Sequence, residues 1–281
     1  MKKGLVLEGG AMRGLFTVGI LDALMENGFV FDGAVGVSAG AVFGCNIKSG
    51  QIGRALRYNL AFCRDKRYCG FHSLVTTGNY YNADFCYRTI PHTLDWFDVE
   101  AFRNNPMDFY VVATHAVTGD AVYHNCLSGD DGDIDWLRAS ASMPLVSKPV
   151  VIDGEPYLDG GVADSIPIDF SASLGFDKTL VILTQPKGYT KKKFELLPLA
   201  KHIYKDNPQF IEALQKRHEK YNDALLKVDQ KEKEGSIYVL RPEHKLSVKR
   251  TDRNPQSLLA VYMEGRQLAQ RKLTDLKEYF S

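Results

Sequence analysis

The sequence has few cysteines, no surplus of either charge and no long apolar run, and each absence excludes a class of protein. Its five cysteines are odd in number and form no Cys-x-x-Cys pair, so neither a disulfide framework nor a zinc knuckle is indicated. No apolar stretch reaches the roughly 18 residues of a membrane span. The 35 basic residues nearly balance the 34 acidic ones, which argues against a nucleic-acid partner.

The N-terminal residues do not resemble a signal peptide, and the spacing of the His and Cys residues does not resemble a metal site. Residues 1–3 carry two lysines directly before the short apolar run 5–7, which is too short for a signal peptide. Together with the unpatterned cysteines, this predicts a cytoplasmic protein. The nearest approach to a ligand set is His115, His124 and Cys126, but its spacing fits no standard pattern, so we expect no metal and no cofactor.

Short apolar runs alternate with helical patterns over the first two thirds of the 281 residues. This alternation is typical of βαβ units and predicts an α/β fold with a mainly parallel central sheet flanked by helices. The expected strands are 5–7, 34–37, 109–113, 150–152, 180–183 and 237–240. The expected helices are 15–27, 39–48 and one that begins near 255. Four other apolar residues also fall at roughly helical spacing: Phe210, Leu214, Tyr221 and Leu225.

The pattern changes twice along the chain. Between about 50 and 106 it weakens and aromatic residues gather, which predicts a cap over one end of the sheet. Such a cap is either an apolar substrate pocket or a plain packing cluster. After residue 187 charged residues dominate. We therefore expect residues 1–187 to form the core and residues 188–281 to form a helical C-terminal extension packed on the same domain.

The pentapeptide Gly-Val-Ser-Ala-Gly at residues 36–40 lies where a predicted strand passes into a predicted helix. In this context a Gly-x-Ser-x-Gly sequence forms a sharp, strained turn that lifts the serine hydroxyl clear of the sheet. Gly36 and Gly40 let the strand and the helix approach each other closely. The pattern also arises by chance, but its position after an apolar strand favours Ser38 as a nucleophile.

A second glycine-rich stretch, Glu-Gly-Gly-Ala-Met-Arg-Gly at residues 8–14, also joins a strand to a helix. Backbone of this kind points several N–H groups at one spot, where the helix dipole adds positive potential. The stretch has neither the Gly-x-Gly-x-x-Gly spacing of dinucleotide sites nor the lysine of a P-loop. It therefore indicates a loop that stabilises an anion.

A third signal is an aspartate followed by two glycines, Asp159, Gly160 and Gly161, after the apolar run 150–152. Two glycines let the backbone turn and leave the carboxylate near another element, although an ordinary turn contains the same residues. Beside the other two signals, Asp159 supplies the carboxylate that a serine nucleophile lacks. The nearby Asp153 and Asp164 are expected to be turn and helix-cap residues.

Together the three signals resemble the patatin-like phospholipase family, whose hallmarks are a glycine-rich oxyanion loop, Gly-x-Ser-x-Gly and a distant Asp-Gly-Gly or Asp-Gly-Ala. Segments 139–144 and 164–167 also look like bacterial members, so the resemblance covers roughly residues 4–185. It implies a three-layer patatin-like fold and a serine acyl hydrolase that cleaves carboxylic esters of lipids. One departure is Ala11, where the family usually has a third glycine. A positive φ there would cost about 1 kcal/mol or more.

The resemblance also implies site residues. Asp159 would accept the proton of Ser38 directly, and the serine would then form an acyl-enzyme. An aspartate with a pKa of about 3.9 is a feeble base at neutral pH, so partial burial has to raise the pKa of Asp159. Arg13 and Gly14 are expected to order the loop, with charge neutralisation of Glu8 as the other role for Arg13. The oxyanion would be held by the backbone N–H groups of Gly9, Gly10 and Ala11.

Two alternatives remain open from the sequence. A true α/β hydrolase would use a Ser, Asp, His triad, for which His202, His218 and His244 follow Asp159 in the chain. A non-catalytic lipid- or nucleotide-binding protein of related fold would carry no activated serine. The expected partner is a lipid ester, with peripheral membrane contact through the aromatic segment 62–97. Head group, acyl chain length, position of cleavage and oligomeric state have no signal in the sequence.

Overall fold

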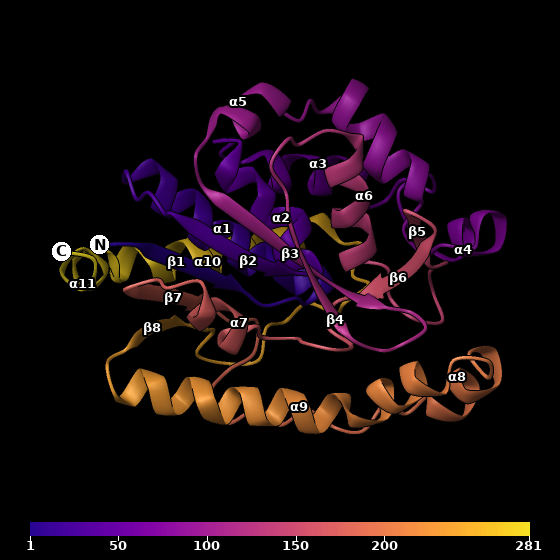
Figure 1. Cartoon of the computed structure of the whole chain (residues 1–281). Helices are drawn as coiled ribbons and strands as arrows, with labels where there is room; N and C mark the ends of the chain where they lie inside the picture. The colour runs from indigo at the N-terminus through magenta and orange to yellow at the C-terminus, as the bar shows by residue number, and fades with distance from the viewer.

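An eight-stranded sheet forms the middle layer of the molecule, with helices on both of its faces (Figure 1). A computed structural model describes all of residues 1–281. Along the sheet the strand order is β5-β6-β3-β2-β1-β7-β8, and β4 pairs with β3. The strands are β1 (Lys3–Leu7), β2 (Gly33–Val37), β3 (Asp108–His115), β4 (Ala121–Asn125), β5 (Val150–Ile152), β6 (Glu155–Asp159), β7 (Lys178–Ile182) and β8 (Ile237–Leu240).

The sheet is mostly parallel, as the alternation of strands and helices predicts. Strands β3, β2, β1, β7 and β8 pair in parallel. At the other edge β4 and β6 each pair antiparallel with β3, and β5 pairs antiparallel with β6. Strand β1 lies in the centre and is apolar along its length because both of its faces are covered. Leu5 and Leu7 pack into the largest core cluster, and Val6 packs into a second cluster on the opposite face.

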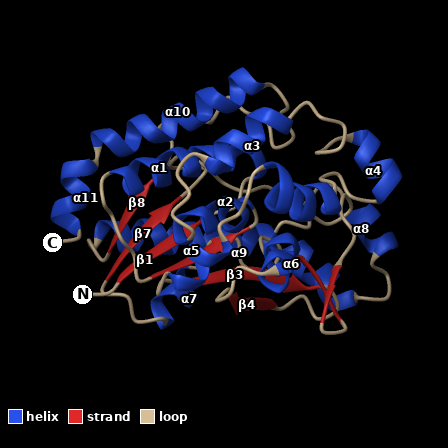
Figure 2. Ribbon diagram, turned by 90° about the horizontal axis from the view of Figure 1, so that it is seen from above, coloured by secondary structure: helices blue, strands red, loops and turns tan.

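The helices form the two outer layers. One layer contains α1 and α2 with the C-terminal α10, and the other contains α7 and α9 (Figures 1 and 2). The main helices are α1 (Gly14–Glu26), α2 (Ala39–Lys48), α3 (Arg54–Phe62), α4 (Phe71–Thr77), α5 (Val99–Asn104), α6 (Asp131–Ser140), α7 (Ile168–Ser173), α8 (Leu197–Ile203), α9 (Pro208–Lys233), α10 (Pro255–Arg271) and α11 (Leu273–Tyr279). The remaining helical elements are a 3₁₀ turn, η1 (Ala11–Arg13), and a π-helix, η2 (Phe85–Leu94).

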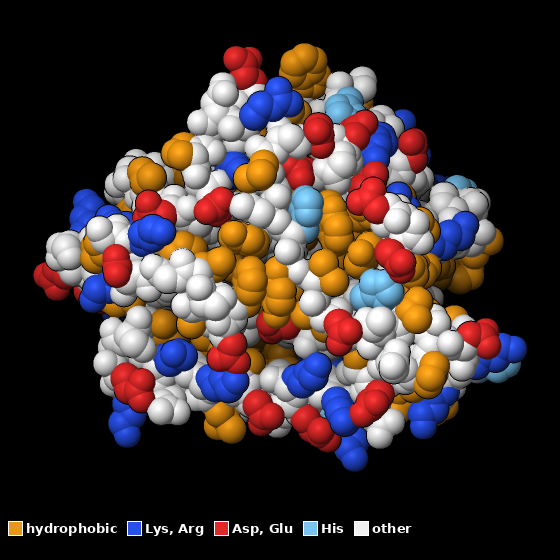
Figure 3. Space-filling model, viewed as in Figure 1, with side chains coloured by type: hydrophobic (Ala, Val, Ile, Leu, Met, Phe, Trp, Pro, Cys, Tyr) orange, Lys and Arg blue, Asp and Glu red, His pale blue; other side chains and the backbone are white.

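The C-terminal residues extend the same layers rather than standing apart. Strand β8 pairs in parallel with β7 and so lengthens the sheet. Helix α10 lies along α1 (Figure 2), and a Cβ at Gly265 would lie 2.0 Å from the carbonyl oxygen of Phe16. The charged side chains of α9 line the lower edge of the molecule in Figure 3, where they face water. These contacts support an extension packed on one domain, which stays a prediction.

The expected elements compare closely with the observed ones. All six expected strands are present, and the helices expected at 15–27 and 39–48 are α1 and α2. Strands β4 and β6 were missed because their sequences, AVYHN and EPYLD, carry polar residues and a proline instead of an apolar run. The fold class is confirmed as α/β with a mainly parallel sheet between helices.

Candidate active site

Ser38 lies at the sharp turn between β2 and α2, at one end of the sheet. Its φ of 54° is a left-handed conformation that non-glycine residues rarely adopt, as expected for a strained serine turn. A Cβ at Gly40 would lie 2.3 Å from the carbonyl oxygen of Leu7, so only glycine permits this approach of α2 to β1. The N–H of Ser38 donates to Ser140 Oγ at 2.8 Å, which fixes the turn against α6.

Asp159 ends strand β6 and faces Ser38. Its Oδ2 accepts a hydrogen bond from Ser38 Oγ at 2.7 Å, and its Oδ1 accepts one from the N–H of Gly161 at 2.8 Å. The residue is only 5% exposed. Burial raises the pKa of Asp159 above its ordinary value, and the guanidinium of Arg217 and the bond from Ser38 oppose that rise. The carboxylate therefore combines contact with the serine and a stronger basicity than an exposed aspartate.

The backbone around Asp159 is held by β3 and by the segment that follows α6. Thr114 Oγ1 donates to the carbonyl oxygen of Asp159 at 2.8 Å, and the N–H of Asp159 donates to the carbonyl oxygen of Ser142 at 2.8 Å. A Cβ at Gly160 would lie 2.0 Å from the carbonyl oxygen of Val112, which explains the glycine there. The close fit leaves the Asp159 side chain little freedom to move away from Ser38.

The two other aspartates of this region do not reach Ser38. Asp153 occupies the turn between β5 and β6 with a φ of 52°, as a turn residue does. Asp164 Oδ2 accepts a hydrogen bond from the hydroxyl of Tyr123 at 2.8 Å. Asp164 is not the cap of α7, because the residue at that position is Pro167.

The glycine-rich loop at residues 8–14 lies directly against the serine. A Cβ at Gly9 would lie 2.8 Å from Cβ of Ser38. The N–H groups of residues 9–11 donate to no protein acceptor, so all three are free to bind an anion. Ala11 adopts a φ of 49°, and the strain expected for an alanine in place of the family's third glycine is therefore present.

The charged residues of this loop are held by several elements. Arg13 Nε donates to the carbonyl oxygen of Gly10 at 3.4 Å, and Arg13 forms no ion pair with Glu8. Instead, Glu8 accepts hydrogen bonds from the N–H of Thr184 and the hydroxyl of Tyr221, each at 2.6 Å. Gly14 begins α1, where a Cβ would lie 2.8 Å from Cβ of Ala39. Arg13 thus contacts the loop backbone, and α9 contributes to the loop through Tyr221.

An apolar cavity of about 870 Å³, part of it open to solvent, begins at Ser38. Seventeen of its twenty lining residues are hydrophobic, which suits an acyl chain. Other aromatic residues of the cap, such as Phe85 and Phe102, pack into the core instead. Segment 50–106 therefore both lines a pocket and forms a packing cluster. Its aromatic lining residues are Tyr58, Tyr68, Tyr81, Tyr87 and Phe97.

A second pocket is also lined by Ser38 and contains basic side chains that the sequence analysis missed. Lys191, Arg217 and Arg250 join Arg13 there. No motif marks these three residues, because they come from separate segments that only the fold brings together. The strong charge content after residue 187 was the one available signal.

No histidine takes part in this arrangement. None of the seven lines either pocket, and none bonds to Ser38 or Asp159. Of the three histidines that a triad would need, His218 Nδ1 approaches the carbonyl oxygen of Gln215 at 3.0 Å. His202 and His244 are exposed.

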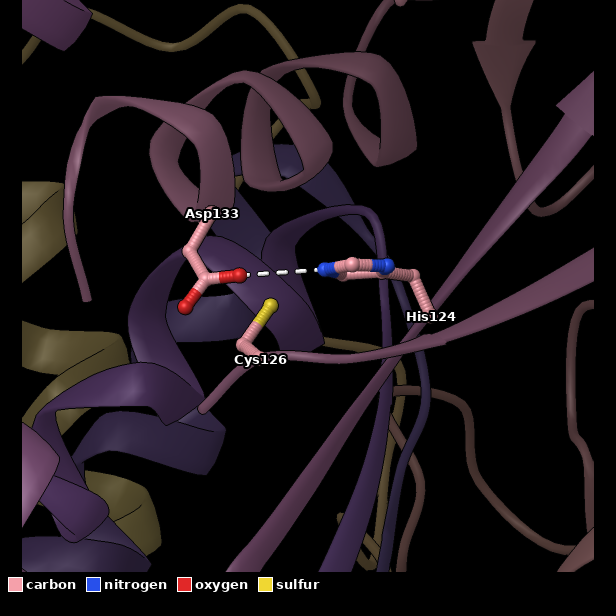
Figure 4. Close-up of side chains that lie close together, drawn as sticks. All are labelled: His124, Cys126 and Asp133. Atoms are coloured by element: carbon pink, nitrogen blue, oxygen red, sulfur yellow. Dashed lines mark hydrogen bonds and ion pairs between the residues drawn. The ribbon is translucent and has the colours of Figure 1, made fainter. Parts of the chain in front are cut away.

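The cluster nearest to a metal-ligand set is His124, Cys126 and Asp133, whose ligand atoms lie within 4.8 Å of one another (Figure 4). His124 Nε2 is 3.0 Å from Asp133 Oδ1, and Asp133 Oδ2 already accepts hydrogen bonds from the loop at 128–129. The ammonium of Lys48 contacts the carbonyl oxygen of Cys126 at 2.9 Å and would repel a cation. We interpret the cluster as a structural network. His115 is not part of it and pairs with Glu155.

Two family models match parts of this chain. A family model described as patatin-like phospholipase matches residues 5–171, and a domain of unknown function, DUF6363, matches residues 207–281. The uncharacterized protein YjjU of Escherichia coli K12 is 30% identical over 243 residues, which are 74% of this chain and 64% of that protein. Lysophospholipase nte1 of Aspergillus niger is 31% identical over 187 residues, 62% of this chain and 11% of that protein. The solved structure of VipD from Legionella pneumophila has a TM-score of 0.48 and 14% identity, covering 98% of this chain and 67% of VipD.

The chain therefore belongs to the patatin-like phospholipase family. The chain spans 64% of the length of YjjU and 11% of the length of the fungal lysophospholipase. None of its helices combines the length and the apolar character that a membrane span requires.

Proposed function

We propose that the protein is a serine acyl hydrolase that cleaves carboxylic esters of lipids, of phospholipase A type, through a dyad of Ser38 and Asp159. The observation that carries the proposal is the 2.7 Å hydrogen bond from Ser38 Oγ to the buried carboxylate of Asp159. The free N–H groups of residues 9–11 beside the serine support it. Nucleophile, base and anion donors then occupy one end of the sheet.

In the proposed mechanism, Asp159 accepts the hydroxyl proton as Ser38 Oγ attacks the ester carbonyl. The oxyanion that forms accepts hydrogen bonds from the N–H groups of Gly9, Gly10 and Ala11, and loss of one such donor typically costs about 10²- to 10³-fold in rate. Asp159 then gives its proton to the leaving alcohol and afterwards takes one from the water that attacks the acyl-enzyme. One carboxylate thus serves both halves of the reaction.

The acyl chain of the substrate occupies the apolar cavity in this proposal. The cavity begins at Ser38 and is lined by aromatic residues of the cap. Because the ester carbonyl must lie over Ser38, the rest of the substrate extends toward the second, polar pocket. This placement favours lipid esters over small esters, since the buried chain contributes about 0.8 kcal/mol for each CH₂ group.

The two alternatives from the sequence find less support. A Ser, Asp, His triad needs a histidine at Asp159 or Ser38, and Asp159 instead contacts the serine itself. A non-catalytic binding protein has no need of a strained serine turn with a φ of 54° beside free N–H groups.

The first test is covalent labelling. A fluorophosphonate probe is expected to label the wild-type protein, and Ser38→Ala is expected to abolish both labelling and ester hydrolysis while the fold persists. The control is Ser173→Ala on the exposed part of α7, which keeps both activities. Near-normal turnover by Ser38→Ala would remove the serine from the mechanism.

Peripheral membrane contact is a further part of the proposal. Within the aromatic segment 62–97, Phe71 is 78% exposed and Trp96 is 74% exposed. Large apolar side chains of this exposure are suited to the interface of a bilayer, from which a lipid hydrolase draws its substrate. The cytoplasmic location expected from the sequence stays a prediction.

A further inference from the structure

The basic pocket and the apolar cavity meet at the serine. Ala11, Ser38 and Met143 line both of them. The basic pocket encloses about 910 Å³, part of it open to solvent, and also contains Asp159. A substrate whose ester lies over Ser38, with its acyl chain in the apolar cavity, therefore directs its other end into the basic pocket.

Four cationic side chains line this pocket, and they come from four separate segments. Arg13 belongs to η1, Lys191 to the loop after β7, Arg217 to α9 and Arg250 to the loop before α10. None of the four forms an ion pair within 4.0 Å, although eighteen such pairs exist elsewhere in the chain. Unpaired cations gathered around one cavity indicate an anionic ligand.

The contacts of these side chains are with uncharged groups. Arg217 Nε donates to the carbonyl oxygen of Gly161, and Arg13 Nε donates to the carbonyl oxygen of Gly10. Lys191 Nζ lies 3.6 Å from the ring centroid of Tyr221, a cation–π contact. Burial and the positive charge of Arg217 lower the pKa of Lys191 well below its usual range. A bound anion would offset both effects.

The carboxylates of the pocket do not neutralise it. There are two, Glu8 and Asp159, against four cations. Both oxygens of Glu8 accept hydrogen bonds from Thr184 and Tyr221, and both oxygens of Asp159 accept hydrogen bonds from Ser38 and Gly161. The pocket keeps an excess of positive charge beside the nucleophile.

We infer that the basic pocket binds the phosphate of the substrate head group and selects lipids whose head group carries net negative charge. The inference rests on the proposed function and names its substrate class. Guanidinium groups bind phosphate oxygens in bidentate fashion, and lysine adds a point charge. A choline head group would add a fifth cation to the four of the pocket, whereas a neutral glycerol head group would leave all four without an anionic partner. Residues 188–281, part of which matches the domain of unknown function, supply three of these four side chains.

The experiment compares three soluble short-chain substrates with the same acyl chain, used below their micellar concentrations: a monoacylglycerol, a lysophosphatidylcholine and a lysophosphatidic acid. The wild-type protein is expected to show a kcat/KM for lysophosphatidic acid at least tenfold above the other two. Lys191→Met and Arg250→Met are each expected to lower the ratio of lysophosphatidic acid to monoacylglycerol by about 10- to 100-fold, as for the loss of a hydrogen bond to a charged group.

Lys216→Met is the matched control, because Lys216 precedes Arg217 on α9 but is exposed and pairs with Glu212. Its substrate ratio is expected to equal that of the wild type. Circular dichroism of each variant verifies that the fold persists, and Arg250→Met carries the test if Lys191→Met unfolds, since Arg250 is exposed.

A second arm separates a lipid head group from a free phosphate ion. Inorganic phosphate and glycerol 3-phosphate are added during monoacylglycerol hydrolysis, and competitive inhibition that weakens in the Lys191→Met variant supports the head-group site. Activation by phosphate without any preference for lysophosphatidic acid would overturn it in favour of a regulatory anion. Equal kcat/KM for all three substrates overturns the phosphate inference alone, whereas hydrolysis of none of them overturns the proposed function as well.

Discussion

Replacing Asp159 with asparagine isolates the proposed base. The new side chain keeps the size of aspartate and can still accept the hydrogen bond from Gly161, whose N–H lies 2.8 Å from Oδ1. What it loses is the capacity to accept a proton from Ser38. General-base assistance contributes about 10²- to 10⁴-fold, which is about 3–5 kcal/mol of activation free energy. Because one carboxylate serves both acylation and deacylation, we expect a loss at the upper end of that range.

The raised pKa of Asp159 gives this prediction a pH dependence. Wild-type kcat/KM is expected to fall on the acid side as the pH drops through the raised pKa, and the asparagine variant is expected to lack this limb. For stability, the contribution of a group with a raised pKa is complete below the ordinary value of 3.8 and is lost as the pH rises through the folded-state value. At pH 7 the variant is therefore expected to unfold at a higher temperature than the wild type.

The assay is the initial rate of hydrolysis of a chromogenic medium-chain ester, with thermal unfolding followed in parallel. Asp164→Asn is the matched control. Burial also raises the pKa of Asp164, but this carboxylate accepts a hydrogen bond from Tyr123 instead of Ser38. Alanine at each of the seven histidines is expected to retain substantial activity. Turnover by Asp159→Asn within tenfold of the wild type would refute the reasoning, as would a folded histidine variant as inactive as Ser38→Ala.

Three further predictions concern the loop, the aspartate turn and the cap. Ala11→Gly removes a strained φ of 49°, so it is expected to raise the free energy of unfolding by up to about 1 kcal/mol, and a lower urea midpoint would contradict this. Gly160→Ala places a Cβ 2.0 Å from a carbonyl oxygen and is expected to lower that free energy by about 2 kcal/mol or more in urea unfolding. Phe71→Ser with Trp96→Ser is expected to reduce co-sedimentation with liposomes, whereas Leu226→Ser, equally apolar and 69% exposed on α9, leaves it unchanged. Binding that is absent in the wild type would count against the membrane contact.

Much of the fold can be predicted from local sequence. The buried strands β1, β2 and β7 are covered on both faces, so each needs an unbroken apolar run, and such a run is visible without any partner. Strands β4 and β6 cannot be predicted from an apolar run, because they lie toward the antiparallel edge of the sheet, where polar residues are tolerated. The serine turn and the glycine-rich loop are also local, since a strained turn restricts the residues immediately beside it.

The relations between distant residues were decided by the tertiary structure alone. The sequence by itself marks Ser38 and Asp159 as candidates. The hydrogen bond between them and the burial that raises the pKa of Asp159 arise only because β2 and β6 pair with opposite sides of β3. Lys191, Arg217 and Arg250 have no local pattern, because a single cation on a surface helix or loop is ordinary. They become a basic pocket only when three separate segments meet at the serine, since electrostatic potential sums over distance in space and not along the chain.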